Sequence, residues 1–427
     1  MRKKHVLIIG ELFYPANNIG AIRPTKLAQN LLLAGCEVDV FTSEKCSNSQ
    51  HHTGAGYRIV SPCVEHGAEE FFQAVDSKPT AARARKRGKF LTDLAMTRRQ
   101  WLQYNKSKAF VEQFKAEVTA GRIVLTDYDC IFTTFGPIGS ILVGLEAKKM
   151  RPELRWICDF RDPMVSQIMP KLFMPFYGYL QRKSIRMADH VTTVSNGYKK
   201  RIMPKKYVDK CVVIPNGYDG EDRNTFAQVK TGEKFSFAYV GALYEGKRDL
   251  GLLFRAIRSA LDAVLILEEA IEFHYAGTEG RFLRQQAAHY GLESIIKEHG
   301  QIAHDECLRL QASVRFLVMS TWNDKGEEGV FPGKLIEYML MQKPVVNIVG
   351  GKLPNCEVTQ VIRQLGLGVS CEEADKSTFE DLSAWLTEQC ESYRAGKDAV
   401  FDPKITEIEA RYTWKNIVKR FGELIDG

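Results

Sequence analysis

Residues 239–248 read Tyr239-Val240-Gly241-Ala242-Leu243-Tyr244-Glu245-Gly246-Lys247-Arg248. The pattern predicts the end of a strand, a glycine turn and then two cations before a new helix. Gly241 permits a close approach of the backbone to a ligand. Cations at the start of a helix oppose the helix dipole, which stability alone would not favour. The stretch therefore indicates a strand–turn–helix unit whose loop holds an anionic ligand.

The same alternation of strands and helices runs along the whole chain, which at 427 residues is too long for one ordinary core. Short β-branched runs separated by helical patterns indicate βαβ units and parallel sheets. The expected strands are 5–10, 36–42, 56–62, 130–135, 155–160, 190–195 and 211–216, then 235–241, 271–276, 296–302, 314–320 and 343–349. Each half predicts a doubly wound sheet, and the seam is expected in 217–234, which is rich in turn residues.

The composition, with 44% hydrophobic and 26% charged residues, is that of an ordinary globular protein. No run approaches the ~18 apolar residues of a membrane-spanning helix. The apolar stretch after the basic start is too short for a signal peptide, so we expect a cytoplasmic protein. The ten cysteines are scattered without a Cys-x-x-Cys pair. We therefore expect reduced cysteines, and neither a disulfide frame nor a metal site.

Positive charge is concentrated in one segment. The net charge of the chain is +7, and residues 83–99 hold seven basic residues against Asp93 alone, a local +6. Over 83–102 the basic residues alternate with Leu94, Trp101 and other apolar residues near helical spacing. The pattern is typical of an amphipathic helix drawn to an anionic membrane surface. A merely solvated helix is the alternative, whereas no recognition motif supports nucleic acid binding.

Several other loops carry candidate functional residues. Gly20 follows the first strand, where a glycine lets the backbone approach a phosphate or sugar, although a plain turn is the alternative. The loop Asp159-Phe160-Arg161-Asp162-Pro163 places an arginine between carboxylates at a strand end, suited to sugar hydroxyls or a phosphate, or to a structural salt bridge. Asn216 and Gly217, at the expected seam, are predicted to be hinge residues. No Rossmann glycine fingerprint, P-loop or nucleophile elbow occurs, which argues against dehydrogenases, NTPases and α/β-hydrolases.

These loops, in this order, resemble those of the family 4 retaining glycosyltransferases of GT-B fold, particularly bacterial members that build surface polysaccharides. The blocks of the resemblance are 14–21, 159–163, 194–197, 214–219, 239–248 and 329–338, and it extends from about residue 5 to about residue 420. The chain departs from the family pattern at three positions. Ala21 replaces a second glycine, Ala242 stands where an arginine is usual, and Gly329 falls on the first of two glutamates, although Glu327 and Glu328 lie just before it.

The resemblance implies two Rossmann-like, doubly wound parallel-sheet domains that face each other across a cleft. Residues 1–216 would form the acceptor-side domain with a helical insertion at about 63–125, residues 217–408 the nucleotide-sugar-binding domain, and 409–427 a helix that packs back on the first domain.

The resemblance also implies a donor site. Gly20 and Gly241 would approach the donor, Lys247 and Arg248 would neutralise its diphosphate, and Glu337 would bind its ribose. The first N–H groups of a helix that begins after Pro332, at Gly333 and Lys334, would also meet the diphosphate.

The implied reaction is transfer of a sugar from a nucleotide diphosphate sugar to a sugar or lipid-linked acceptor, with retention of configuration. Arg161 and Asp162 would act on the acceptor side, Lys247 and Arg248 on the leaving group, and no metal or other cofactor would be required. Two alternatives stay open: a GT-B nucleotide-sugar epimerase, and a non-catalytic subunit that binds nucleotide sugars. The sequence does not identify the base, the sugar, the acceptor or the oligomeric state.

Overall fold

The computed structural model describes residues 2–15, 19–43, 56–60, 89–166 and 169–427. Their backbone forms two compact units. Unit 1 contains Met1–Pro215 and Trp414–Gly427, and unit 2 contains Asn216–Thr413. The chain thus passes from unit 1 to unit 2 at Pro215 and returns at Thr413.

Unit 1 is built on a seven-stranded parallel sheet in the order β3-β2-β1-β4-β5-β6-β7. This is a doubly wound order with its switch point between β1 and β4. The strands are β1 (His5–Gly10), β2 (Glu37–Thr42), β3 (Arg58–Ile59), β4 (Cys130–Thr134), β5 (Arg155–Phe160), β6 (His190–Thr193) and β7 (Cys211–Val213). Apart from the first residue of β1, β2, β5 and β6 and the short edge strands, these strands are buried, as parallel strands between helical layers must be.

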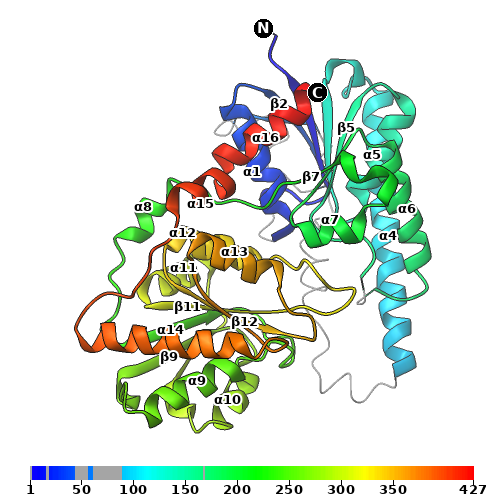
Figure 1. Cartoon of the computed structure of the whole chain (residues 1–427). Helices are drawn as coiled ribbons and strands as arrows, with labels where there is room; N and C mark the ends of the chain where they lie inside the picture. Colours follow the sequence, from blue (N-terminus) through cyan, green and yellow to red (C-terminus); the bar gives the residue numbers. More distant parts are fainter. Residues whose placement is uncertain (1, 16–18, 44–55, 61–88, 167–168) are drawn as a thin grey trace. The chain divides into compact units, whose positions relative to one another are not determined.

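Helices cover both faces of this sheet, as Figure 1 shows. They are α1 (Ile19–Leu33), α4 (Lys89–Thr119), α5 (Gly139–Met150), α6 (Met174–Met187), α7 (Asn196–Ile202) and α16 (Trp414–Asp426). On one face α1 and α16 enclose a core with β1, β2 and β4, in which Phe132 meets Phe421 edge to face at 5.6 Å. On the other face α4 and α5 pack together, and Phe41 of β2 stacks on Phe110 of α4 at 4.7 Å.

Unit 2 repeats the design with a six-stranded parallel sheet in the order β10-β9-β8-β11-β12-β13. Its strands are β8 (Phe235–Val240), β9 (Ile271–Ala276), β10 (Ile296–Gly300), β11 (Phe316–Trp322), β12 (Val345–Gly350) and β13 (Gly368–Glu372). The last strand was not predicted, because a short run that begins with glycine has little β-branched character. The switch point of this sheet lies between β8 and β11.

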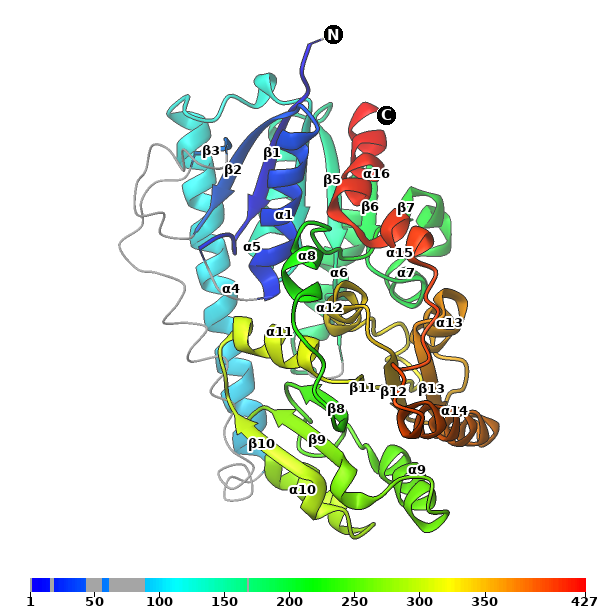
Figure 2. The same ribbon diagram turned by 90° about the vertical axis from the view of Figure 1, so that its left-hand side faces the viewer.

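The helices of unit 2 form two layers with separate cores, visible on either side of the sheet in Figure 2. One core includes residues of α9 (Gly251–Asp262), α10 (Gly280–Ala288) and α14 (Ser377–Arg394). The other includes residues of α11 (His304–Ser313), α12 (Gly333–Met341), α13 (Glu357–Leu365) and α15 (Ile405–Tyr412), while the short α8 (Asp222–Ala227) packs against it. The segment 409–427 therefore holds the end of α15, in unit 2, and all of α16, in unit 1.

The predicted insertion at 63–125 lies partly outside the described residues. From residue 89 onward it is the 31-residue helix α4. Ser107, Phe110 and Phe114 of this helix are buried, so its second half is part of unit 1.

Candidate donor site

The candidate donor site lies at the carboxyl ends of β8 and β11 in unit 2. Open α/β sheets bind ligands at this place, where the strand order reverses. Gly241 follows β8 directly, Trp322 ends β11, and α12 begins at Gly333 after the next loop. Six of the predicted donor residues, from Gly241 to Glu337, therefore belong to loops and a helix around one switch point.

The loop after β8 has an unusual backbone. Gly241 has a φ of 109°, a conformation that L side chains rarely adopt, and Tyr244 and Glu245 both have left-handed φ values, 54° and 57°. The carboxylate of Glu279, the residue before α10, holds this loop. It accepts backbone N–H groups from Leu243 at 2.6 Å, Tyr244 at 3.1 Å and Glu245 at 2.8 Å. No sequence pattern signals Glu279, because it lies 34 to 36 residues from its partners.

Lys247 and Arg248 follow this loop and differ in their surroundings. Lys247 is 45% exposed, pairs with Glu327 at 3.0 Å and lies 4.0 Å from the centroid of the Trp322 ring. Arg248 is buried and donates to the Tyr239 hydroxyl at 3.3 Å and to the Ala242 carbonyl at 3.1 Å. The two predicted cations are thus brought to the switch point, one at the surface and one inside.

A third cation lies inside the site, on the first turn of α12. The Nζ atom of Lys334 is buried 4.4 Å from the centroid of the Tyr239 ring, and it has no hydrogen-bond partner among the described residues. Burial, together with the nearby charge of Arg248, lowers the pKa of Lys334 to about 7. The sequence marked Lys334 only for its backbone N–H group, so its side chain was missed.

Glu337 lies one turn further along α12. Its Oε2 atom accepts a hydrogen bond from Nε2 of Gln311, on α11, at 3.2 Å. Gln311 is almost fully buried and orients the carboxylate, while Glu337 itself stays half-buried. A carboxylate held in this way can accept hydrogen bonds from the two hydroxyl groups of a ribose.

Of the remaining predicted residues, Gly20, Arg161 and Asp162 belong to unit 1, whereas Asn216 and Gly217 are the first two residues of unit 2. Gly20 lies in the first turn of α1, and the residues before it at 16–18 are outside the described part of the chain. Arg161, at the end of β5, donates to the carbonyls of Phe135 at 2.9 Å and Gly136 at 2.8 Å. Desolvation lowers the pKa of this guanidinium. These contacts tie Arg161 to the loop between β4 and α5, whereas Asp162 is exposed.

The sequence also missed a buried ion pair between Arg23 and Asp159. Arg23 is 1% exposed and donates through Nε and one Nη to both carboxylate oxygens, at 3.0 and 2.8 Å. Its other N–H groups reach the carbonyls of Ile214 and Pro215, each at 3.0 Å. Arg23 therefore fixes the last residues of unit 1, directly before Asn216.

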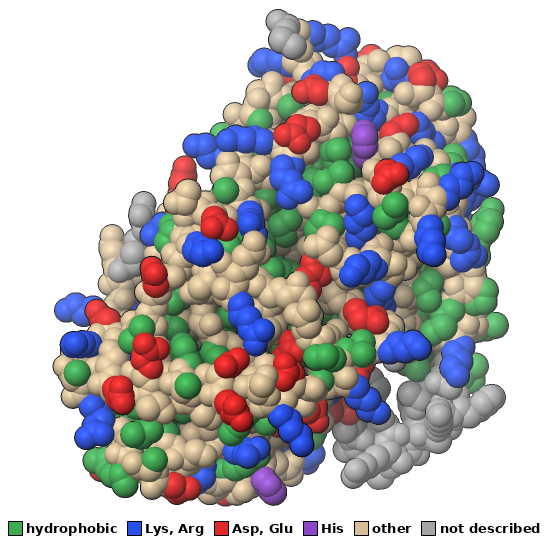
Figure 3. Space-filling view, viewed as in Figure 1, with side chains coloured by type: hydrophobic (Ala, Val, Ile, Leu, Met, Phe, Trp, Pro, Cys, Tyr) green, Lys and Arg blue, Asp and Glu red, His purple; other side chains and the backbone are tan. Residues whose placement is uncertain are grey.

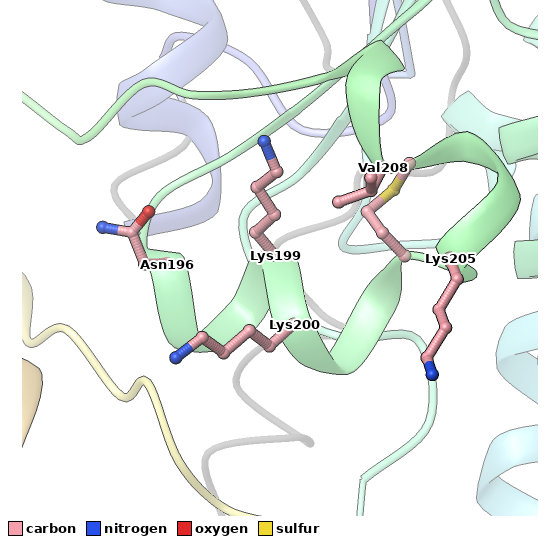
Figure 4. Close-up of a pocket in the computed structure, with 6 residues that line it drawn as sticks. Asn196, Lys199, Lys200, Lys205 and Val208 are labelled. Atoms are coloured by element: carbon pink, nitrogen blue, oxygen red, sulfur yellow. The ribbon is translucent and has the colours of Figure 1, made fainter.

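A surface hollow of about 450 Å³ lies over α7 and the following 3₁₀ turn (Figure 4). It is lined by Asn196, Lys199, Lys200, Met203, Lys205 and Val208. Lys199 is already engaged, since its ammonium donates to the carbonyl of Cys211 at 2.6 Å. The described residues that line this hollow include none of the predicted site residues.

The basic segment 83–102 is described from residue 89 onward, so Arg83, Arg85, Lys86 and Arg87 lie outside the described residues. The described part starts α4, where Leu94, Trp101 and Leu102 are 56%, 55% and 45% exposed. In the space-filling view, lysine and arginine side chains are spread among hydrophobic ones over the whole visible face (Figure 3). Within the described ranges, no helix is both long and apolar enough to cross a membrane.

Comparison with known proteins places these features in a class. Residues 234–378 match the family described as glycosyl transferases group 1, a segment that includes the whole candidate donor site. None of the curated proteins matches the chain significantly.

Solved structures match over the full length. Sucrose-phosphate synthase from Thermosynechococcus elongatus is 16% identical with a TM-score of 0.61, covering 99% of this chain and 98% of that chain. An α,α-trehalose 6-phosphate synthase from Burkholderia multivorans is 11% identical with a TM-score of 0.60, covering 100% and 98%. A glycosyltransferase from Rickettsia africae is 15% identical with a TM-score of 0.57, covering 100% and 98%.

At these identities the structural similarity shows the fold, which is GT-B, with two parallel-sheet α/β domains as predicted. The matched segment adds the activity class, so the resemblance to family 4 glycosyltransferases is confirmed. Together, the family match and the fold support a glycosyltransferase that uses a nucleotide sugar.

Proposed function

We propose that the protein transfers a glycosyl group from a nucleotide diphosphate sugar to a sugar or lipid-linked acceptor, with retention, in the synthesis of a surface polysaccharide or other glycan. The observation that carries the proposal is the group of three cations at the switch point of unit 2. Lys334 is on the first turn of α12 and lies over the ring of Tyr239, whose hydroxyl accepts from Arg248, while Lys247 pairs with Glu327. Basic side chains gathered near the first N–H groups of a helix favour an anionic ligand there.

The proposed chemistry is electrostatic. The cations and the first N–H groups of α12 stabilise the charge that develops on the departing diphosphate. Glu337, oriented by Gln311, binds the ribose and fixes the donor along the helix. The departing phosphate oxygen takes the proton of the acceptor hydroxyl as that hydroxyl attacks from the same face, while Arg161 and Asp162 contribute on the acceptor side. Since protein cations supply the positive charge, we propose that transfer requires no metal ion.

A ligand screen tests the donor site. We expect one of UDP-, GDP-, ADP- or TDP-glucose to stabilise the protein against heat, by ~2.7 kcal/mol at a concentration 100 times its Kd. Lys247→Ala should weaken binding about 10- to 100-fold, because a charge-assisted hydrogen bond contributes ~1.5–3 kcal/mol. Lys325→Ala, which removes an exposed lysine from the loop after β11, is the matched control and should bind normally. Unchanged affinity in a folded Lys247→Ala, Arg248→Ala double variant would refute the site.

Activity assays separate the enzyme from a binding subunit. Transfer of the sugar, or slow hydrolysis of the donor, is expected only of an enzyme, and the anomeric configuration of the product tests retention. Activity that survives EDTA would support the proposal that no metal is required, and activity lost to EDTA and restored by a divalent cation would contradict it.

We further propose that the segment 83–102 docks the protein on the inner face of the membrane, where a lipid-linked acceptor would be found. Exposed apolar residues beside Arg98 and Arg99 at the start of α4 support this proposal over a merely solvated helix. The attraction to anionic lipid is ~1 kcal/mol per basic residue and decays within ~8–10 Å in salt.

The test is co-sedimentation with vesicles of rising anionic lipid content. Binding should rise with lipid charge, fall with salt and fall in a variant with serine at positions Arg85, Lys86, Arg87, Arg98 and Arg99. Equal binding by both proteins would show that the segment is a solvated helix, and it would favour a soluble acceptor.

A further inference from the structure

The interior of the candidate donor site holds several buried donors and no acceptor for them. Nζ of Lys334, Nε of Arg248 and Nε1 of Trp322 are all buried without a hydrogen-bond partner among the described residues. Most buried polar groups in proteins are paired, so unpaired ones need an explanation, such as a site that binds an ion. All three atoms are nitrogens that can donate, and two of them belong to basic side chains, so the ligand that suits them carries acceptor oxygens and negative charge.

Two of these residues are joined through one tyrosine. Arg248 donates to the hydroxyl of Tyr239, and the ammonium of Lys334 lies 4.4 Å from the centroid of the same ring. A Cβ atom added to Gly241 would lie 2.9 Å from Nζ of Lys334, so the glycine makes room for the lysine. Ala242 stands where the family resemblance leads us to expect an arginine. Lys334, from the other side of the site, is therefore suited to supply that charge.

The groups around Lys334 make its charge dependent on a ligand. Burial and the positive charge of Arg248, in the loop after β8, both disfavour the protonated form of Lys334. Glu337 on α12 and Cys307 on α11 favour the protonated form, but their effect is smaller. Tyr239 of β8 presents a neutral ring, because burial raises the pKa of its hydroxyl. Without a ligand, burial and Arg248 hold the pKa of Lys334 at about 7.

We propose that Lys334 binds the donor diphosphate through its side chain and takes up a proton from solvent as it does so. The inference rests on the proposed function and adds a regulatory property to it. The neutral amine becomes an ammonium when the diphosphate enters, no other bond is made or broken, and donor affinity falls as the pH rises above neutrality. A nucleotide sugar is suited to test this, because its diphosphate stays ionised throughout the neutral range.

The experiment is calorimetric titration of the full chain with UDP-, GDP-, ADP- and TDP-glucose between about pH 6 and 9. In the wild type, Kd should rise about tenfold per pH unit above pH ~7.5, since each bound donor then requires one proton. Titration at about pH 8.5 in two buffers of different ionisation enthalpy should give close to one proton taken up per donor bound.

Two variants isolate the lysine. Lys334→Met, of similar length and without charge, should bind ~10- to 100-fold more weakly at pH ~6, take up no proton and converge with the wild type at high pH. Lys247→Met should bind more weakly but keep the wild-type pH dependence, because Lys247 is exposed and already paired.

The outcomes separate the two proposals. Donor binding by the wild type without proton uptake, or a pH dependence unchanged in Lys334→Met, would overturn the role of Lys334 and leave the donor site standing. If no nucleotide sugar binds the wild type at any pH, the proposed function itself fails.

Discussion

Replacing Glu279 with glutamine tests how the cationic loop is held. The carboxylate accepts three successive backbone N–H groups from 243–245, and two of those residues have left-handed backbones. Each left-handed residue other than glycine costs on the order of 1–3 kcal/mol, and each hydrogen bond to a charged acceptor contributes about 1.5–3 kcal/mol. The free energy contributed by the three hydrogen bonds therefore exceeds the cost of the two left-handed residues by only a few kcal/mol.

Glutamine keeps one acceptor oxygen and turns an amide NH₂ toward the loop. At least one N–H group loses its partner, and the rest lose the charge of the acceptor. We expect a loss of about 2–3 kcal/mol in the free energy that holds the loop. The carbonyls of Leu243 and Tyr244 accept the N–H groups of Arg248 and Lys247, so the two cations depend on this backbone. With the loop near parity between two conformations, about half of the molecules would be competent to bind, so affinity for a nucleotide diphosphate should fall about twofold.

Hydrogen exchange and calorimetry check this prediction. The amides of 243–245 should exchange faster in Glu279→Gln, while those of β8 stay protected. Glu298→Gln is the matched control, because Glu298 pairs with Arg284 near the same helix and makes no bond to the loop in the described structure. Unchanged exchange at 243–245 together with unchanged affinity would show that Glu279 does not hold the loop.

Three further predictions concern single side chains. Glu337→Gln should weaken binding of ribonucleotides about tenfold and of their 2′,3′-dideoxy analogues much less, and an equal loss for both would exclude ribose binding. Asp159→Asn leaves the Arg23 guanidinium buried without its counter-charge and should cost about 3–5 kcal/mol in denaturant unfolding, whereas a cost below ~1 kcal/mol would contradict a structural role. The pKa of Lys334 is about 7 in the folded chain, against an ordinary value of 10.5 for an exposed lysine, so the contribution of this lysine to stability should fall as pH drops from 10.5 to 7 and level off below. Lys334→Met should be the more stable protein by roughly 2–4 kcal/mol near neutrality, by thermal unfolding, and no pH-dependent difference would contradict the lowered pKa.

The parts of the fold that local pattern decides were predicted well. The strands His5–Gly10 and Arg155–Phe160 are short, mostly apolar runs bounded by polar residues, and the structure places strands at these bounds. The strand Gly368–Glu372 was missed, because its place in the sheet depends on pairing with Val345–Val349 rather than on its own composition. The strand predicted at 211–216 ends at Val213, since the next carbonyls turn to accept from Arg23.

The residues of the candidate site also differ in how far the sequence alone could point to them. Gly241, Lys247 and Arg248 could be predicted because a strand, a turn and cations follow one another in the chain. Glu279 could not be, because it is recognisable only by the amides that it accepts from another loop. The side chain of Lys334 was hidden for a further reason. A lysine in the first turn of a helix is ordinarily solvated, and only the structure places its ammonium in the interior beside Tyr239.

The position of Lys334 also bears on one departure from the family pattern, the alanine at position 242. Alanine at 242 removes a cation from the loop after β8, yet the site keeps a buried arginine at 248 and gains a buried lysine from α12. In the site as we propose it, part of the positive charge lies on the first turn of a helix whose N–H groups also suit an anionic ligand. A permanently charged arginine would repel Arg248 in the empty site, whereas a lysine can remain neutral until an anion enters. If Lys334 binds the diphosphate as we propose, the site combines the fixed charge of Arg248 with a second charge that the donor itself induces.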